Sequence, residues 1–182
     1  VDVFGPYMIR RARSEVKYYV CLYTCFASRA CHLEVLESLD ITSFINSFRR
    51  FVARRGRVES VTSDNGSNFV GGHGELSRAL EEWNNSGIEE RFRQTGVKWV
   101  FLTPRASHHN GVVERMNGLA RTSLHHALAG QTISAETFTT VVAEVESILN
   151  GRPLTRCSAD PRDPSPLTPN DVLLSKVHAP LP

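Results

Sequence analysis

The order of hydrophobic periods in the first third of the chain restricts the fold more than any other feature. Residues 1–9, 16–26 and 32–36 are predicted to be strands; the second is rich in aromatic and β-branched residues, and Leu33 and Val35 face together in the third. Residues 41–55 instead repeat apolar side chains every three to four positions, which is typical of an amphipathic helix. The pattern therefore predicts an antiparallel meander of three strands followed by a helix.

Individual residues refine these first elements. On the second strand one face is predicted to carry Val16, Tyr18, Val20 and Leu22, and the opposite face Tyr19 and Tyr23. Asp40 can cap the start of the helix and Gly56 can end it. A kink or bulge is expected in the first strand at Gly5-Pro6, because proline cannot donate to a strand ladder.

Strand and helix patterns alternate through the rest of the chain. Further strands are predicted at residues 58–62 and 97–102, with helical patterns at about 74–83 and 88–94 between them. Two longer helices are predicted at about 111–129 and 135–149, the first with an apolar stripe of Val113, Met116, Ala120, Leu124 and Ala127 and the second capped by Ser134. Prolines are frequent after residue 150, so we expect a domain over 1–150 and an extended segment over 151–182.

The stretch Thr62–Phe69 holds a candidate functional residue. Asp64 stands where an apolar strand ends, and Asn65-Gly66 after it favours a tight turn. A carboxylate at the end of a buried strand is fixed in space and open to solvent, which suits a metal ligand. An ordinary Asp-Asn-Gly turn is the alternative.

Composition sets the outer limits. A chain of 182 residues can bury one full core, and no apolar run approaches the roughly 20 residues that span a bilayer. Four cysteines without zinc spacing predict reduced thiols in an intracellular protein without a signal peptide. The chain begins inside an apparent strand, so we expect it to be part of a longer protein.

Charge is distributed unevenly. Residues 1–57 carry ten Lys/Arg and five Asp/Glu, whereas residues 58–150 carry seven and eleven. A basic first third beside an acidic middle suits a polyanion-binding surface next to a carboxylate-rich site. The solvated faces of an ordinary globular domain would explain the same numbers.

Three segments in this order resemble the catalytic core of retroviral and retrotransposon integrases, which are Asp-Asp-Glu polynucleotidyl transferases. They are Asp2-Val3-Phe4-Gly5-Pro6, Ser63-Asp64-Asn65-Gly66-Ser67-Asn68-Phe69, and His109-Asn110-Gly111-Val112-Val113-Glu114-Arg115-Met116-Asn117-Gly118. The later segments Ile148-Leu149-Asn150-Gly151-Arg152-Pro153-Leu154 and Pro166-Leu167-Thr168-Pro169 fit best with Bel-Pao-type LTR retrotransposons. The resemblance spans nearly the whole chain.

The resemblance implies a fold and a metal chemistry. The implied fold is α/β and RNase H-like, with a mixed five-stranded sheet of three antiparallel and two parallel strands flanked by helices. Asp2, Asp64 and Glu114 would be the catalytic residues and the ligands of two Mg²⁺ ions when DNA is bound, with Mn²⁺ as an alternative ion. Asp2 would bridge both ions. Glu114 is expected in the first turn of its helix, where the helix dipole favours a carboxylate.

The resemblance also implies contacts to DNA. Arg121 lies two turns after Glu114 on one helical face and would bind a phosphate. Asn110 matches a loop amide that touches the viral DNA end, Asn117 would support the site, and Arg105 and His109 are placed on the loop just before the helix. An exposed arginine that only supports its helix is the alternative for Arg121.

Two departures from the family pattern stand out. Gly118 occupies a position that is basic in retroviral integrases, and the segment between Asp64 and Glu114 is longer than in retroviral cores, with the extra length at about residues 71–96. The expected function is 3′-end processing and strand transfer of retroelement DNA by a homo-oligomer that acts in the nucleus after a cytoplasmic particle stage. The alternatives are an RNase H-like nuclease or DNA transposase, and a host-adopted, non-catalytic DNA- or protein-binding module.

Overall fold

The structure is a computed structural model. It describes residues 1–64, 78, 82–83, 87, 90, 92, 96–102, 107–157, 160 and 162–174. The predicted turn after Asp64 and most of the predicted helices at 74–83 and 88–94 lie outside these residues.

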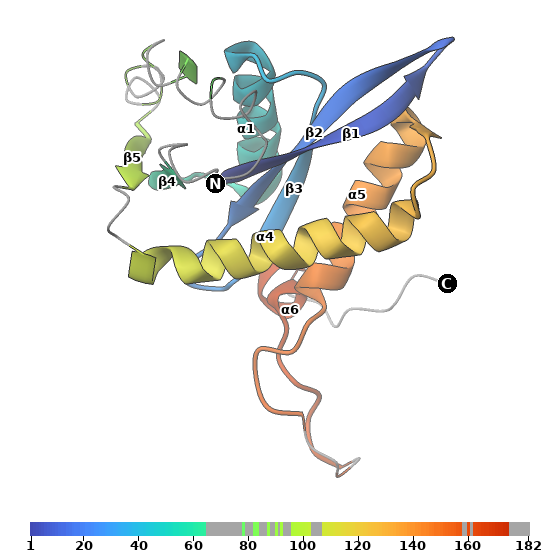
Figure 1. The fold of residues 1–182 in the computed structure, drawn as a ribbon. Coiled ribbons are helices and arrows are strands. Elements are labelled where there is room, and N and C mark those ends of the chain that lie inside the picture. The colour runs from blue at the N-terminus through green and yellow to red at the C-terminus, as the bar shows by residue number, and fades with distance from the viewer. Residues whose placement is uncertain are drawn as a thin grey trace.

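The predicted antiparallel meander is confirmed. β1 (Asp2–Arg11), β2 (Ser14–Thr24) and β3 (Cys31–Leu36) pair in the order β3-β2-β1, and the short β6 (Ile133–Ser134) adds to the free edge of β1 in parallel (Figure 1). The meander follows from strand segments rich in aromatic and β-branched residues that are joined by short polar turns. β6 has only two residues, which is too short to leave a periodic pattern in the sequence.

The predicted irregularity in β1 is also present. The register of β1 against β2 shifts between Phe4 and Tyr7. Gly5 has a φ of 133°, and a Cβ at this position would lie 3.1 Å from the carbonyl oxygen of Tyr18. Glycine is therefore required here both by conformation and by the close approach of β2.

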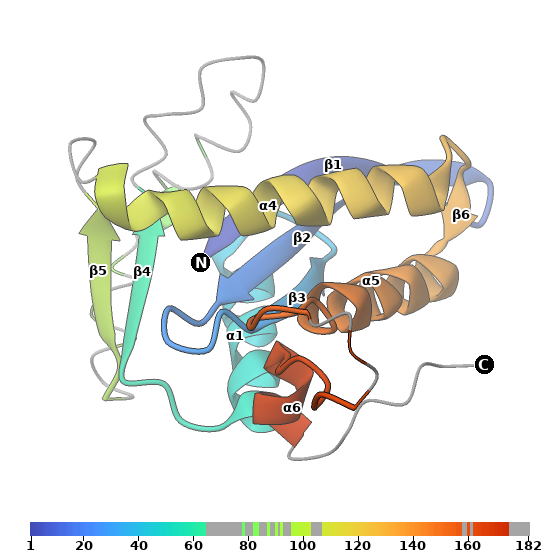
Figure 2. The ribbon, with the colours of Figure 1, turned by 90° about the horizontal axis from the view of Figure 1, so that it is seen from below.

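The parallel strands form a separate pair. β4 (Ser60–Asp64) pairs in parallel with β5 (Lys98–Leu102), and the five predicted strands are thus divided between a four-stranded and a two-stranded sheet (Figure 2). The Val1 nitrogen donates to the carbonyl oxygen of Thr62 at 2.6 Å, so the end of β4 lies beside the start of β1. The two sheets are nevertheless separate, which differs from the continuous five-stranded sheet that we expected.

Helices cover both faces of the meander, in agreement with the two predicted faces of β2. Tyr19, Cys21 and Tyr23 pack with α1 (Ile41–Arg55) in one core cluster. Tyr18, Val20 and Leu22 pack in a second cluster with α4 (Ser107–Leu128) and α5 (Ala135–Asn150). Figure 1 shows the meander between α1 and the α4–α5 pair.

Predicted caps and stripes are largely confirmed. Asp40 accepts a hydrogen bond from Ser43 N–H at the start of α1, Gly56 ends α1 with a φ of 89°, and Ser134 caps α5. On α4, Met116, Ala120 and Leu124 are buried as expected. Ala127 is exposed and Leu128 packs in its place, because the stripe drifts around the helix.

The segment after residue 150 is not wholly extended. α6 (Pro169–Leu174) follows an irregular stretch and packs against α5, where Asn170 Nδ2 donates to the Ser147 carbonyl oxygen at 3.3 Å. Proline at the first helical position lacks an N–H that would have no helical partner anyway. The proline-rich composition therefore concealed a short helix.

Candidate active site

Asp2 is the predicted site residue that the structure describes most completely. It is the first residue of β1, and the adjacent Val3 and Phe4 are fully buried and hold the strand in place. Its Oδ1 accepts a hydrogen bond from Val3 N–H at 2.8 Å, and its Oδ2 accepts one from Asn117 Nδ2. The carboxylate is therefore held through both oxygens, one from its own strand and one from α4.

Asn117 is fixed in turn by Arg121, one helical turn further along α4. Arg121 Nε donates to Asn117 Oδ1 at 2.8 Å, and the guanidinium carbon lies 5.3 Å from the centroid of the Phe4 ring. Residues four apart on a helix face each other, so this contact follows from the sequence spacing. Since Phe4 belongs to β1, the contact with Arg121 is a second link between α4 and this strand.

The electrostatics of Asp2 favour a cationic partner. Burial raises the pKa of Asp2, although the Val3 N–H, Arg121 and Asn117 all favour the carboxylate. A carboxylate that is poorly solvated gains from a divalent cation, which is the largest local charge that a site can hold. The donor chemistry of Asp2 thus fits a hard cation such as Mg²⁺.

Asp64 is placed by its backbone. It is the last residue of β4, where it pairs with Leu102 of β5. Thr62, two residues earlier, contacts the start of β1, so the backbones of Asp64 and Asp2 lie at the same edge of the molecule. The Asp64 side chain lies outside the described part of the chain.

Glu114 differs from the prediction in its place on the helix. α4 begins at Ser107, four residues before the expected start, so Glu114 stands in the third turn and the first turn contains no acidic residue. The helix dipole acts mainly on the first turn and therefore does not explain a carboxylate at this position. Glu114 is exposed and stands three residues before Asn117 on the same side of α4.

The earlier start of α4 also moves two predicted DNA contacts. His109 and Asn110 belong to the first turn of α4 and not to a loop before it. Their side chains, like the whole of Arg105, lie outside the described residues. Within the part of the chain that is described, no group of three or more His, Cys, Asp or Glu side chains could hold a metal ion. The predicted triad is not tested by that search, because it includes Asp64.

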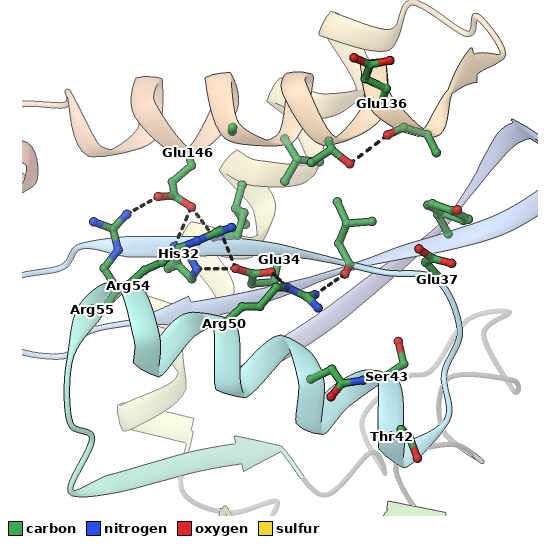
Figure 3. Close-up of a pocket in the computed structure, with 18 of the residues that line it drawn as sticks. His32, Glu34, Glu37, Thr42, Ser43, Arg50, Arg54, Arg55, Glu136 and Glu146 are labelled. Atoms are coloured by element: carbon green, nitrogen blue, oxygen red, sulfur yellow. Dashed lines mark hydrogen bonds and ion pairs between the residues drawn. The ribbon is translucent and has the colours of Figure 1, made fainter.

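A cluster of charged side chains between β3, α1 and α5 has no counterpart in the predicted site (Figure 3). His32, which is 3% exposed, places Nε2 at 2.9 Å from Glu34 Oε1 and Nδ1 at 3.0 Å from Glu146 Oε2. Arg50 and Arg54 of α1 bind Glu34, at 2.5 and 2.9 Å. We call these residues, together with Arg55, the His32 cluster.

Three members of the His32 cluster, His32, Glu34 and Glu146, have pKa values shifted toward their charged forms. Burial disfavours the imidazolium, but the carboxylates of Glu146 and Glu34 outweigh it and raise the pKa of His32. Burial also disfavours both carboxylates, yet hydrogen bonds from His32, with Arg50 at Glu34 and the Leu33 N–H at Glu146, lower the pKa of both groups. The cluster therefore joins β3 to α1 and α5 by charge.

The His32 cluster also lines a groove of about 800 Å³ over β3, between α1 and α5. Arg50 and Arg54 are 43% and 61% exposed there, and Glu37 and Glu136 add acidic groups to the rim. The candidate active-site residues Asp2, Asn117 and Arg121 do not line this groove. It is a candidate surface for contacts between proteins rather than for the chemistry.

The Asn-Gly-Arg-Pro segment at the end of α5 also has a structural role. Asn150 is 1% exposed, its Oδ1 accepts from Cys31 N–H at 2.8 Å, and its Nδ2 donates to the Cys31 carbonyl oxygen at 2.7 Å. Arg152 donates to the carbonyl oxygens of Leu149 and Arg29. These residues fasten the end of α5 to the β2–β3 turn, so this part of the resemblance is structural.

Two further observations concern the part of the chain that the structure describes. The four cysteines are free, as expected from their spacing. Across the described residues, no helix is long and apolar enough to cross a membrane.

The chain has no match among family models or curated sequences, but its fold is similar to that of solved structures. Among solved structures, a chain of the simian T-cell lymphotropic virus intasome, in complex with the PP2A regulatory subunit B56 gamma, is similar at 17% identity with a TM-score of 0.57. The match covers 92% of this chain and 56% of the simian virus chain, so this chain spans little more than half of that protein.

Two structures of the HTLV-2 integrase catalytic core in complex with magnesium are also similar. The trimeric form matches at 17% identity and a TM-score of 0.52, over 85% of both chains. The dimeric form matches at the same identity and TM-score, over 87% of this chain and 88% of the viral core. At this identity the likeness establishes architecture alone: the chain has the fold of the retroviral integrase catalytic cores.

Proposed function

We propose that this chain is the catalytic core of a retroelement integrase, which uses divalent metal ions for 3′-end processing and for strand transfer into target DNA. The observation that carries the proposal is the restraint of Asp2. A carboxylate held through both oxygens, beside the end of the strand that carries Asp64, is what a preorganised metal site requires. Because the fold is integrase-like, we favour a metal ligand at Asp2 over a buried aspartate without a catalytic role.

Asp2, Asp64 and Glu114 would hold the ions. When bound, two such ions would activate the attacking oxygen and stabilise the leaving 3′ oxygen of a phosphoryl transfer. The protein's own contribution is to hold the Asp2 carboxylate at the edge of β1 and to keep its oxygens oriented before metal and DNA arrive. The HTLV-2 cores were solved with magnesium, and we propose the same ion here, with Mn²⁺ as the alternative.

DNA would lie along α4. We propose phosphate contacts by Arg121, with Asn110, Arg105 and His109 near the DNA end and Asn117 in support of Asp2. The bond from Arg121 to Asn117 uses Nε, so a phosphate would be bound through Nη1 and Nη2. The Bel-Pao-type assignment, the nuclear site of action and the cytoplasmic particle stage belong to the same proposal.

We also propose that the protein acts as a homo-oligomer, because two DNA ends must be joined together. The groove between α1 and α5 is the surface that we assign to this contact. Its exposed arginines and acidic rim suit a copy related by two-fold symmetry, which would bring opposite charges together. The HTLV-2 core, which is similar in fold, was solved in a dimeric and a trimeric form.

The test is a reaction of the full-length protein with its own terminal DNA and a target DNA, in Mg²⁺ and in a chelator. Integrase activity predicts a shortened 3′ end and a joined product, both of which require the metal ion. Cleavage of an RNA–DNA hybrid without any joined product would instead favour an RNase H-like nuclease. DNA binding without any reaction would favour a non-catalytic module.

A further inference from the structure

Three side chains connect α4 to the first residue of β1 in series. The guanidinium of Arg121 donates through Nε to Asn117 Oδ1, and Asn117 Nδ2 donates to Asp2 Oδ2. Asn117 is 9% exposed, so its amide is enclosed between the two charged groups. Arg121 also lies over the Phe4 ring, two residues after Asp2 on the same strand.

The chemistry of this series fixes the orientation of the Asn117 amide. A carboxylate only accepts hydrogen bonds and a guanidinium only donates them. A primary amide does both, because its oxygen accepts and its NH₂ group donates. The amide joins the two charges in one orientation, with Nδ2 toward Asp2 and Oδ1 toward Arg121. In the opposite orientation an oxygen would face a carboxylate and an N–H would face a guanidinium.

We infer that Arg121 is a positioning residue, which orients the Asp2 carboxylate by holding the Asn117 amide. This inference rests on the proposed function, since it gives Arg121 a role in the assembly of the metal site in addition to any contact with DNA. The role depends on the planar guanidinium and its Nε–H, held over Phe4, and not on positive charge alone. Lysine is a flexible point charge without a planar group and would not reproduce it.

Arg121→Lys separates the two roles. A phosphate contact would be largely retained, because the charge is kept. A positioning role would be lost: the Mg²⁺ concentration for half-maximal strand transfer by the full-length protein should rise, or the rate at saturating DNA should fall, by about 10-fold, as is typical when a group behind a metal ligand is removed. Affinity for the terminal DNA should change by less than about two-fold, since the phosphate charge is still present.

The matched control is Arg115→Lys, which makes the same change on the exposed surface of the same helix. It should leave both the Mg²⁺ dependence and the DNA affinity unchanged. An Arg121→Lys protein with wild-type Mg²⁺ dependence and rate would overturn the inference. So would a loss of DNA affinity with unchanged Mg²⁺ dependence, which would make Arg121 a phosphate contact only.

A second readout does not depend on activity. With ¹⁵N-labelled asparagine in the full-length protein, the Asn117 side-chain signals are identified by their absence in Asn117→Asp. They should shift in Arg121→Lys and in Asp2→Asn, and remain in place in Arg115→Lys. If the Asn117 signals are the same in Arg121→Lys and in the wild type, the inference is contradicted, whether or not the protein carries out strand transfer. If they shift in Arg121→Lys but the wild type has no strand-transfer activity, the side-chain series stands and the proposed function is rejected.

Discussion

Asn150 supplies Cys31 with the partners that a neighbouring strand would otherwise provide. Its amide group binds both the N–H and the carbonyl oxygen of Cys31, at 2.8 and 2.7 Å, from the last turn of α5. A buried backbone N–H or C=O without a hydrogen-bond partner costs free energy. At the start of β3, the single side chain of Asn150 provides a partner for both backbone groups of the buried Cys31. The residue joins elements that are 119 positions apart in sequence.

Asn150→Ala should therefore destabilise the fold. Each of the two Cys31 backbone groups would lose its partner, at about 1–3 kcal/mol each, so the free energy of unfolding should fall by about 2 kcal/mol or more. Denaturant titration of the variant measures the change. Asn46→Ala, on the exposed face of α1, is the control and should stay within about 0.5 kcal/mol of wild type. Equal losses in the two variants would contradict the assigned role of Asn150.

Arg121→Ala removes both roles proposed for Arg121. Binding to the terminal DNA should weaken, and the slope of log K against log salt should become shallower by up to about one unit, because one phosphate neutralised contributes a slope of about −0.9. Binding measured across a salt series checks this. Arg115→Ala serves as the matched control on α4. Equal affinity and parallel slopes for wild type and Arg121→Ala would contradict the phosphate contact.

At the scale of elements, the His32 cluster ties β3 to both neighbouring helices through charge. The groups that face His32 are Glu34 on its own strand and Glu146 on α5, and Phe51 of α1 stacks on its ring with a centroid distance of 5.4 Å. Arginines of α1 hold the far oxygens of both carboxylates. Both imidazole nitrogens face carboxylate oxygens, so the protonated ring fits the site better than the neutral one.

The stabilisation from the His32 cluster should depend on pH. Because the pKa of His32 is raised above its usual 6.5, its contribution is complete below pH 6.5 and is lost as the pH rises through the raised value. The pKa values of Glu34 and Glu146 are lowered from 4.5, so their contribution is present above pH 4.5 and is lost as the pH falls through the lowered values. The cluster should stabilise the fold most between pH 4.5 and 6.5.

His32→Gln tests this window. The variant should be less stable than wild type, and the difference in the free energy of unfolding should be larger near about pH 5.5 than near about pH 9, because only the protonated histidine binds both carboxylates as a cation. Urea titration at the two pH values measures the difference. His125→Gln, which changes an exposed histidine on α4, is the control. A difference that stays constant or grows with pH would show that His32 acts as a neutral group.

Elements with a strong local pattern could be predicted from the sequence. α1 was predicted with its bounds and both caps, because its apolar period and the capping residues Asp40 and Gly56 all lie within the segment. The start of α4 was predicted too late, since Ser107–Asn110 are polar and leave no apolar stripe. α6 did have a local signal: Thr168 and Asp171 form a reciprocal cap, with Thr168 N–H donating to Asp171 Oδ2 at 2.7 Å.

The candidate site was predictable only in part. The spacing of Asn117 and Arg121 indicates a shared helical face, and the structure shows that they also bind each other. The His32 cluster could not be derived from sequence spacing, because its members come from three elements and meet only in the folded chain. Alternating apolar residues predict that a strand is buried, but they do not show which distant charges will meet on it.

At the scale of the whole molecule, the proposed contact between copies depends on the groove between α1 and α5. Thr139 is an exposed residue of α5 that lines this groove. Thr139→Arg adds a long charged side chain to a groove that already carries exposed arginines. It should weaken self-association of the full-length protein on its DNA ends, since like charges that meet across an interface cost several kcal/mol. Sedimentation across a concentration series measures the change.

The control for the groove is Thr122→Arg, which makes the same substitution on an exposed position of α4. It should sediment as wild type does. A wild-type protein that stays monomeric on DNA ends at high concentration would count against self-association itself. Equal association of Thr139→Arg and wild type would place the contact on another surface.

We propose that carboxylates from β1, β4 and α4 form one metal-dependent active site. Strand transfer by the full-length Asp64→Asn protein tests it most directly, because asparagine keeps the shape of the side chain and removes its charge. The variant should keep the wild-type circular dichroism spectrum and lose both 3′-end processing and strand transfer by at least about 100-fold, the effect of removing one group that stabilises the transition state. Undiminished strand transfer by Asp64→Asn would contradict the account.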